Sequence, residues 1–128
     1  LEDWRGLRDI LCCNPSFHGR ERFDSVMFNS DSPELSFARL YALLRCTLES
    51  KREFDVVLVC QYRPSKWKPR IQWAGCQMCE EVKPYSLLLM DYVIRGALLT
   101  QVNVRGKENL NFLVDTVDPD MFLRVDKY

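Results

Sequence analysis

The feature that most constrains this chain is a series of long apolar segments crowded into 128 residues. β-Branched and aromatic side chains fill these segments, which is typical of strands. So many strands in so short a chain predict an all-β fold that closes into a small barrel. One core suffices at this length, so residues 1–128 are predicted to form a single domain. The segments are residues 22–29, 37–48, 54–62, 85–104 and the Asp-rich stretch 111–125.

The amino-acid composition argues against several classes of protein. Lysine and arginine number 18 and so do aspartate and glutamate, a balance that argues against a strongly basic nucleic-acid surface. The 47% hydrophobic content argues against a disordered tail. The apolar run around residues 86–90 is too short for a membrane span, and Asp91 and Arg95 interrupt it, so we expect no membrane partner.

Outside the strands, local signals predict a few short helical pieces. Apolar residues at helical spacing predict an amphipathic helical arm over residues 1–13, which Asn14-Pro15 would end. Residues 37–48 also fit a helix, but their strand-like neighbours favour a strand, with a hairpin tip at 49–53. The pair Asp118-Pro119 predicts the start of a helical turn over 121–125.

Two glycines mark expected changes of direction in the second half of the chain. Gly96 is predicted to split the long segment 85–104 with a bend or bulge. Gly106 lies in a turn sequence, residues 106–109, that predicts another hairpin tip.

The six cysteines predict a reducing, intracellular compartment rather than a disulfide scaffold. Cys46 and Cys60 lie in apolar strands, where a free thiol behaves as a small buried hydrophobe. Cys76 and Cys79 form a C-x-x-C pair, but a zinc site needs four ligands. The remaining candidate ligands are two adjacent cysteines, Cys12 and Cys13, and the single histidine, His18. Adjacent cysteines fit a shared tetrahedral site poorly, so we expect neither a metal nor another cofactor.

The sequence gives only weak evidence for a set of catalytic residues. His18 follows Cys13 closely, but no orienting carboxylate is evident for a nucleophilic triad. Asp115, Asp118 and Asp120 could bind a divalent cation, yet they lack the glycine and distal glutamate of a calcium loop. We therefore predict that the chain is not an enzyme. A metal-dependent hydrolase or nuclease using these three aspartates remains an alternative hypothesis.

The strongest candidate for function is the irregular segment 63–73. Its cations could contact phosphates while its tryptophans stack on bases, which would make it a DNA-binding surface. The tryptophans could instead join a preceding tyrosine in an aromatic cage for methyl-lysine. In a third interpretation they simply cover one end of the barrel while the cations stay in water. The candidate binding residues are Tyr62, Arg63, Lys66, Trp67, Lys68, Arg70 and Trp73.

A series of phrases in this chain resembles the C-terminal region of fungal Plavaka-type transposases. The resemblance covers nearly the whole chain from about Cys13, and it implies an accessory module beyond the transposase catalytic core. The C-x-x-C pair is typical neither of that family nor of the second family that the chain resembles. The phrases are PSFHGR (15–20), RFDSV (22–26), FARL (37–40), SKWKP (65–69), YVIRG (92–96) and DTVDPDMFLR (115–124).

The strand rhythm also resembles a bromo-adjacent homology (BAH) domain. In such domains an entry strand precedes an Ala-Arg-hydrophobic strand and then a strand ending in an aromatic residue plus Arg-Pro. Here those strands are residues 24–28, 37–44 and 56–64, the last ending in Tyr62-Arg63-Pro64. This resemblance implies an SH3-like or BAH-like barrel and a non-catalytic, nuclear chromatin-recognition or protein-recognition module. A protein or histone peptide is the expected partner, DNA the alternative, and no small-molecule substrate is evident.

Overall fold

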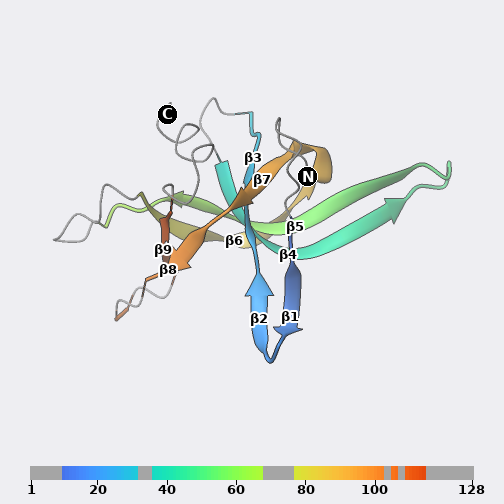
Figure 1. Ribbon diagram of the computed structural model, residues 1–128. Helices are drawn as coiled ribbons and strands as arrows, with labels where there is room; N and C mark the ends of the chain where they lie inside the picture. The colour runs from blue at the N-terminus through green and yellow to red at the C-terminus, as the bar shows by residue number, and fades with distance from the viewer. Residues whose placement is uncertain (1–9, 32–35, 68–76, 103–104, 107–108, 115–128) are drawn as a thin grey trace.

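The computed structural model describes residues 10–31, 36–67, 77–102, 105–106 and 109–114. Within these ranges the chain is almost entirely extended, which confirms the predicted all-β barrel (Figure 1). The elements are β1 Cys13–Phe17, β2 Arg20–Phe23, β3 Ser25–Phe28, β4 Ser36–Thr47, β5 Glu53–Pro64, β6 Met78–Leu89, the 3₁₀ turn η1 Met90–Tyr92, β7 Val93–Ala97, β8 Leu99–Gln101 and β9 Leu110–Leu113.

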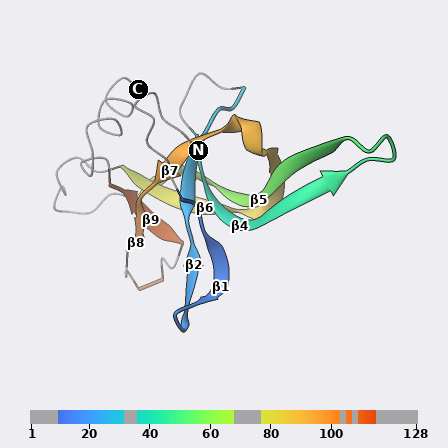
Figure 2. The same ribbon diagram turned by 45° about the vertical axis from the view of Figure 1, so that its right-hand side comes forward.

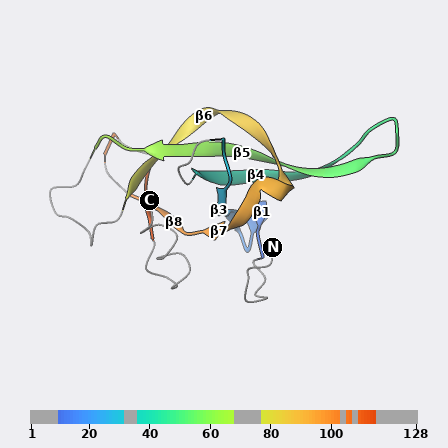
Figure 3. The same ribbon diagram turned by 90° about the horizontal axis from the view of Figure 1, so that it is seen from above.

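Seven strands form one antiparallel sheet in the order β7-β3-β4-β5-β6-β9-β8. The sheet curls strongly, so that β6 arches over one side and β7 lies on the other, which gives a nearly closed barrel (Figure 3). β1 and β2 form a separate hairpin that projects away from this sheet (Figure 2). Among the described residues no helix has the length and apolarity to cross a membrane.

The main core lies against β3, the first half of β4 and the middle of β5. Predicted strands 37–48 and 54–62 correspond to β4 and β5, in which Ala38, Leu40, Val57 and Val59 are fully enclosed. All four residues of β3 are buried, because this short strand contributes side chains to clusters on both of its faces. The largest buried cluster consists of Val26, Phe28, Ala38, Leu40, Val57, Val59 and Val93. Two smaller clusters consist of Met27, Phe37 and Leu113, and of Met78, Val102 and Leu110.

The N-terminal helix prediction is wrong where the structure tests it. Ile10–Cys12 is not helical and Cys13 begins β1, while residues 1–9 lie outside the described ranges. The backbone of Cys12 pairs with Asp24 instead, because its amide donates to Asp24 Oδ2 at 2.8 Å and its carbonyl accepts from the Asp24 amide at 2.9 Å. Pairing with the strands that follow therefore overrides the helical spacing of the apolar residues.

The predicted bend at Gly96 is also wrong. Gly96 lies inside β7, opposite Val26 of β3, and the chain turns instead at η1 and at Leu98. The chain changes direction at η1, because there it leaves β6 and continues as β7, which pairs with β3. Since the apolar residues on both sides suit strands equally, only Asp91 locally favours this turn.

The predicted hairpin tip at 49–53 is confirmed, and Lys51 adopts a left-handed conformation there with φ of 62°. β9 starts one residue before the predicted segment 111–125 and ends at Leu113. The predicted helical turn at 121–125 lies outside the described residues.

Candidate functional site

The residues chosen from the sequence lie along the end of β5 and the segment that follows it. Tyr62 packs against the cluster of Met27, Phe37 and Leu113. Trp67 packs against a different cluster, that of Met78, Val102 and Leu110. The two aromatic rings therefore contribute to separate parts of the core.

The cations of the same segment differ in their surroundings. Arg63 Nη2 lies 3.3 Å from Glu80 Oε2 across the β5–β6 pair, whereas Lys66 is exposed. Lys68, Arg70, Trp73 and Cys76 lie outside the described residues, as do Asp115, Asp118 and Asp120. His18 is exposed at the tip of the β1–β2 hairpin, a loop position. In the described part of the chain no three His, Cys, Asp or Glu side chains come together to hold a metal ion.

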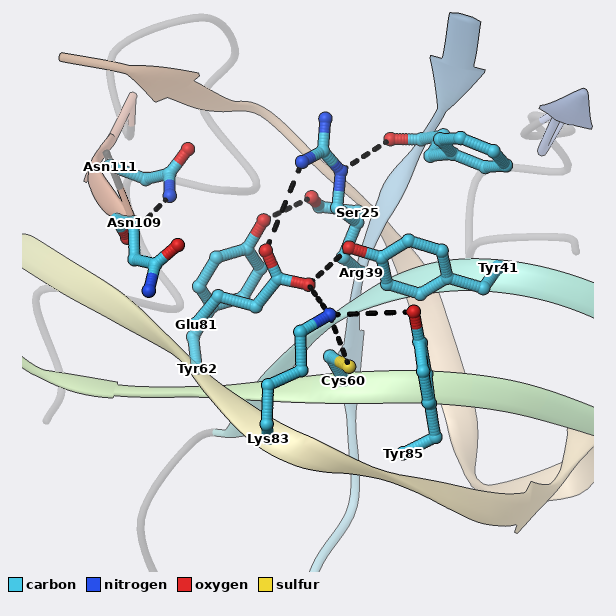
Figure 4. A network of polar contacts seen from close by, with 11 residues as sticks. Ser25, Arg39, Tyr41, Cys60, Tyr62, Glu81, Lys83, Tyr85, Asn109 and Asn111 are labelled. Carbon is cyan, nitrogen blue, oxygen red and sulfur yellow. Dashed lines mark hydrogen bonds and ion pairs between the residues drawn. The ribbon is translucent and has the colours of Figure 1, made fainter. Parts of the chain in front are cut away.

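A polar network that sequence analysis did not identify surrounds Glu81 of β6 (Figure 4). The Glu81 side chain is only 9% exposed, and its carboxylate accepts a hydrogen bond from the Tyr41 hydroxyl. Lys83 Nζ lies 3.7 Å from Oε1 of the same carboxylate, and Arg39 Nη1 lies 3.9 Å from Oε2. One nearly buried carboxylate therefore joins a phenol and two cations from two strands.

Irregularities in the strand pairing place these side chains together. Tyr41 falls at the register shift between Leu40 and Ala42 in the β4–β5 pair. Lys83 falls at the register shift in the β5–β6 pair, where Val59 pairs with Ser86 and Gln61 with Val82. Pro84 occupies the same shift, where its missing N–H removes no regular ladder bond. Bulges of this kind redirect side chains, and here two of them converge on Glu81.

Two tyrosine rings complete a cage around the Lys83 ammonium group. Lys83 Nζ lies 4.4 Å from the centre of the Tyr85 ring and 5.1 Å from that of Tyr41. The two rings meet edge to face, with centroids 5.1 Å apart and planes at 84°. Both distances are within the range of cation–π attraction. We call Tyr41, Glu81 and Tyr85, with Lys83 between them, the lysine cage.

Lys83 and Tyr41 of the lysine cage, and the neighbouring Cys60, hold their protons near neutral pH. Burial lowers the pKa of Lys83, but the Tyr85 hydroxyl and the Glu81 carboxylate outweigh it, so this pKa stands above its ordinary value. Burial, with Glu81 beside it, raises the pKa of Tyr41. Burial also raises the pKa of the Cys60 thiol, although Lys83 Nζ lies 3.6 Å from its sulfur. Near neutral pH Lys83 is therefore a cation, while the Tyr41 phenol and the neighbouring Cys60 thiol are neutral.

An exposed apolar row continues from the lysine cage along β6. Exposure alternates from Tyr85 to Leu89, so that Tyr85, Leu87 and Leu89 share the outward face. On the neighbouring strand β5, Leu58 pairs with Leu87 and Val56 pairs with Leu89. Leu44 of β4 pairs with Val56 in turn, so it lies in the same row as Leu89. The outer face of β4, β5 and β6 thus combines a cation site with exposed leucines.

A sequence signal for part of the cage existed. Glu81, Lys83 and Tyr85 are spaced by two residues, which puts them on one face of a strand. The predicted strand began only at Tyr85, so this spacing was missed. Tyr41 could not be added from the sequence, because its position depends on a bulge.

Comparison with known proteins found no protein-family model, no curated protein and no solved structure that matches this chain.

Proposed function

We propose that this chain is a non-catalytic recognition module that binds a protein partner through a cationic side chain placed in the lysine cage. The observation that carries the proposal is the position of the Lys83 ammonium group. Two tyrosine rings and a nearly buried carboxylate already hold an alkylammonium group at this surface. The same arrangement would hold the lysine or methyl-lysine of another chain.

Displacement of Lys83 would open the cage without unfolding the strand. The Lys83 side chain is 58% exposed, so it can turn into water while the rings stay in place. Methylated ammonium groups suit such a site well, because they lose less hydration than a free lysine when they contact aromatic faces. A nearly buried carboxylate such as Glu81 adds the attraction of an opposite charge.

The surroundings of the cage favour a protein over DNA. The exposed row of Tyr85, Leu87 and Leu89 would contact apolar side chains of an extended peptide, whereas it offers nothing to a phosphate backbone. Together with the BAH resemblance, this supports a chromatin peptide as the partner and the nucleus as the location. The relation to Plavaka-type transposases is proposed on the quoted phrases, and a direct DNA-binding accessory role is its alternative.

A peptide panel tests the proposal. Histone-tail peptides with unmodified, monomethylated, dimethylated and trimethylated lysine would be titrated against the purified chain by fluorescence anisotropy, with a mixed-sequence DNA duplex in parallel. We expect one methylation state to bind best, with little change between low and moderate salt. Tyr85→Ala should weaken this binding about tenfold. Tyr92→Ala is the matched control, since both tyrosines are 49% exposed but Tyr92 contributes nothing to the cage.

Lys83→Ala should tighten peptide binding a few-fold, because it removes the internal competitor. Equal losses in the Tyr85 and Tyr92 variants would contradict the cage proposal. Binding to the duplex alone, falling steeply with salt, would replace it with the DNA-binding alternative.

A further inference from the structure

Three acceptors from the described part of the chain surround the ammonium group of Lys83, one for each of its N–H protons (Figure 4). The distance from Lys83 Nζ is 3.4 Å to the Tyr85 hydroxyl oxygen and 3.6 Å to the Cys60 sulfur. The third acceptor is Glu81 Oε1, which lies 3.7 Å from the same nitrogen. The lysine cage therefore combines ring faces, which attract any cation, with acceptors, which select a cation that still carries N–H protons.

The thiol is the weakest of these acceptors. A sulfur atom accepts hydrogen bonds poorly, whereas a carboxylate accepts them strongly. Cys60 is fully buried, and burial keeps its thiol neutral near neutral pH by raising its pKa. An N–H proton that points at this sulfur gains little, while a methyl group in its place would pack against a buried, polarizable atom. One of the three proton positions thus favours a methyl group.

The other two positions favour a proton. The Glu81 side chain is 9% exposed, so water has little access to its carboxylate if a donor is lost. A methyl group facing Oε1 would hold the cation away from the carboxylate and leave a nearly buried oxygen with one donor fewer. The Tyr85 hydroxyl lies on a side chain that is 49% exposed, so water can replace a lost donor there at a smaller cost.

We propose that the lysine cage selects monomethylated lysine, with the methyl group toward Cys60 and the two N–H protons toward Tyr85 and Glu81. This inference rests on the proposed function and names the methylation state of the lysine that it binds. Unmodified lysine would give up more hydration for the same contacts. Trimethylated lysine would keep the cation–π attraction but would have no proton for either oxygen acceptor.

Simple ammonium ions test this selection without a choice of peptide sequence. Lys83→Ala removes the internal competitor, and because the Lys83 side chain is 58% exposed we expect the fold to be kept. The ¹⁵N-labelled variant would be titrated with butylammonium and with its N-methyl, N,N-dimethyl and N,N,N-trimethyl derivatives, and the amides of Tyr41, Glu81 and Tyr85 would be followed by NMR. The N-methyl ion should bind most tightly, with a Kd on the order of 10 mM. The trimethyl ion should bind about five- to tenfold more weakly than the N-methyl ion.

Substitutions at Tyr85 in the Lys83→Ala chain separate the ring from the hydroxyl. Tyr85→Phe keeps the ring and removes one acceptor, so it should weaken binding of the N-methyl ion about threefold and leave the trimethyl ion unchanged. Tyr85→Ala removes the ring as well and should weaken all four ions. Tyr92→Phe is the matched control, because this equally exposed tyrosine lies outside the cage.

The outcomes distinguish this inference from the proposed function. Equal or tighter binding of the trimethyl ion, or a preference for the N-methyl ion that Tyr85→Phe leaves unchanged, would overturn the selection of monomethylated lysine. The proposed function would survive that result as long as Tyr85→Ala still weakened binding. If none of the four ions bound, or if Tyr85→Ala had no more effect than Tyr92→Phe, both would be overturned.

Discussion

The two halves of the β4–β5 ladder are similarly apolar, but they differ in exposure. Leu40 in the inner half is fully buried, whereas Leu44, four residues further along the same strand, is 45% exposed. Val57 and Val59 of β5 are buried, while Leu48, which directly follows β4 at the outer end of the hairpin, is half exposed. The hairpin formed by these strands extends well beyond the rest of the sheet (Figure 1).

Neighbouring strands account for this difference. β3 covers β4 only over Ser36–Arg39, and β6 pairs with β5 from Val56 onward. Beyond these points β4 and β5 pair only with each other, from Arg45 with Asp55 to Thr47 with Glu53. Burial is therefore decided by which strands lie alongside, rather than by how apolar a residue is. The lysine cage lies where the covered half changes into the exposed one.

The largest expected effect separates the two halves directly. Leu40→Ala should lower the free energy of unfolding by about 3 kcal/mol, because it removes a fully enclosed side chain and leaves a cavity. Leu44→Ala should lower it by less than about 1 kcal/mol, because that side chain is already half in water. Urea denaturation followed by fluorescence measures both. Similar losses would show that the outer half is covered in solution.

A second prediction concerns Cys79, at the inner end of β6. Burial raises the pKa of its thiol to about 11, above the ordinary value of 9.0. Because the folded chain then holds this proton more tightly than the unfolded chain, the contribution is complete below pH 9 and is lost as the pH rises toward 11. Between pH 8 and 10.5 we expect Cys79 to account for a loss of about 2 kcal/mol.

Urea denaturation under reducing conditions at both pH values checks this prediction. Cys79→Ala should lose less stability than the parent chain over that interval. An identical loss in the two proteins would mean that the thiol is reached by water.

A third prediction compares two tyrosine hydroxyls. Tyr62→Phe removes the hydrogen bond to the buried Ser25 and should lower the free energy of unfolding by about 1 kcal/mol. Tyr85→Phe removes an exposed hydroxyl that lies 3.4 Å from Lys83 Nζ, and it should leave stability almost unchanged. Thermal denaturation of the two variants side by side provides the measurement. A larger loss of stability in Tyr85→Phe than in Tyr62→Phe would contradict this prediction, because it would mean that the Tyr85 hydroxyl is the enclosed one.

The sequence predicted the long strands β4 and β5 well, but beyond its hairpin tips it made no prediction about which strands pair. Residues 37–48 and 54–62 are dense enough in strand-forming side chains to identify β4 and β5. By contrast, Ile10 and Leu11 had helical spacing but lie beside a strand hairpin, and Gly96 lies within β7 instead of ending it. In both places pairing between distant segments decides the structure, and a local pattern contains no information about that pairing.

The candidate site shows the same limit. Tyr62 and Trp67 were chosen for their aromatic rings, but only the folded chain shows that each packs in a different part of the core. The cage residues Tyr41 and Glu81 are 40 positions apart, and two register shifts bring them together. No spacing rule in a single sequence predicts where such shifts occur.

The smallest expected effect tests the outer half once more. Arg45 and Asp55 face each other across the hairpin, with Nε 2.8 Å from Oδ1, and Arg45 lowers the pKa of that carboxyl group. A lowered pKa contributes stability above the ordinary value of 3.8 that disappears as the pH falls through the folded value. Both side chains are largely in water, however, where solvent and salt screen the pair. Arg45→Gln should therefore leave the urea midpoint at pH 7 unchanged within error, in low and in moderate salt. A loss as large as that of Tyr62→Phe would show instead that something covers the hairpin in solution, most simply a second copy of the chain, and the midpoint would then depend on protein concentration.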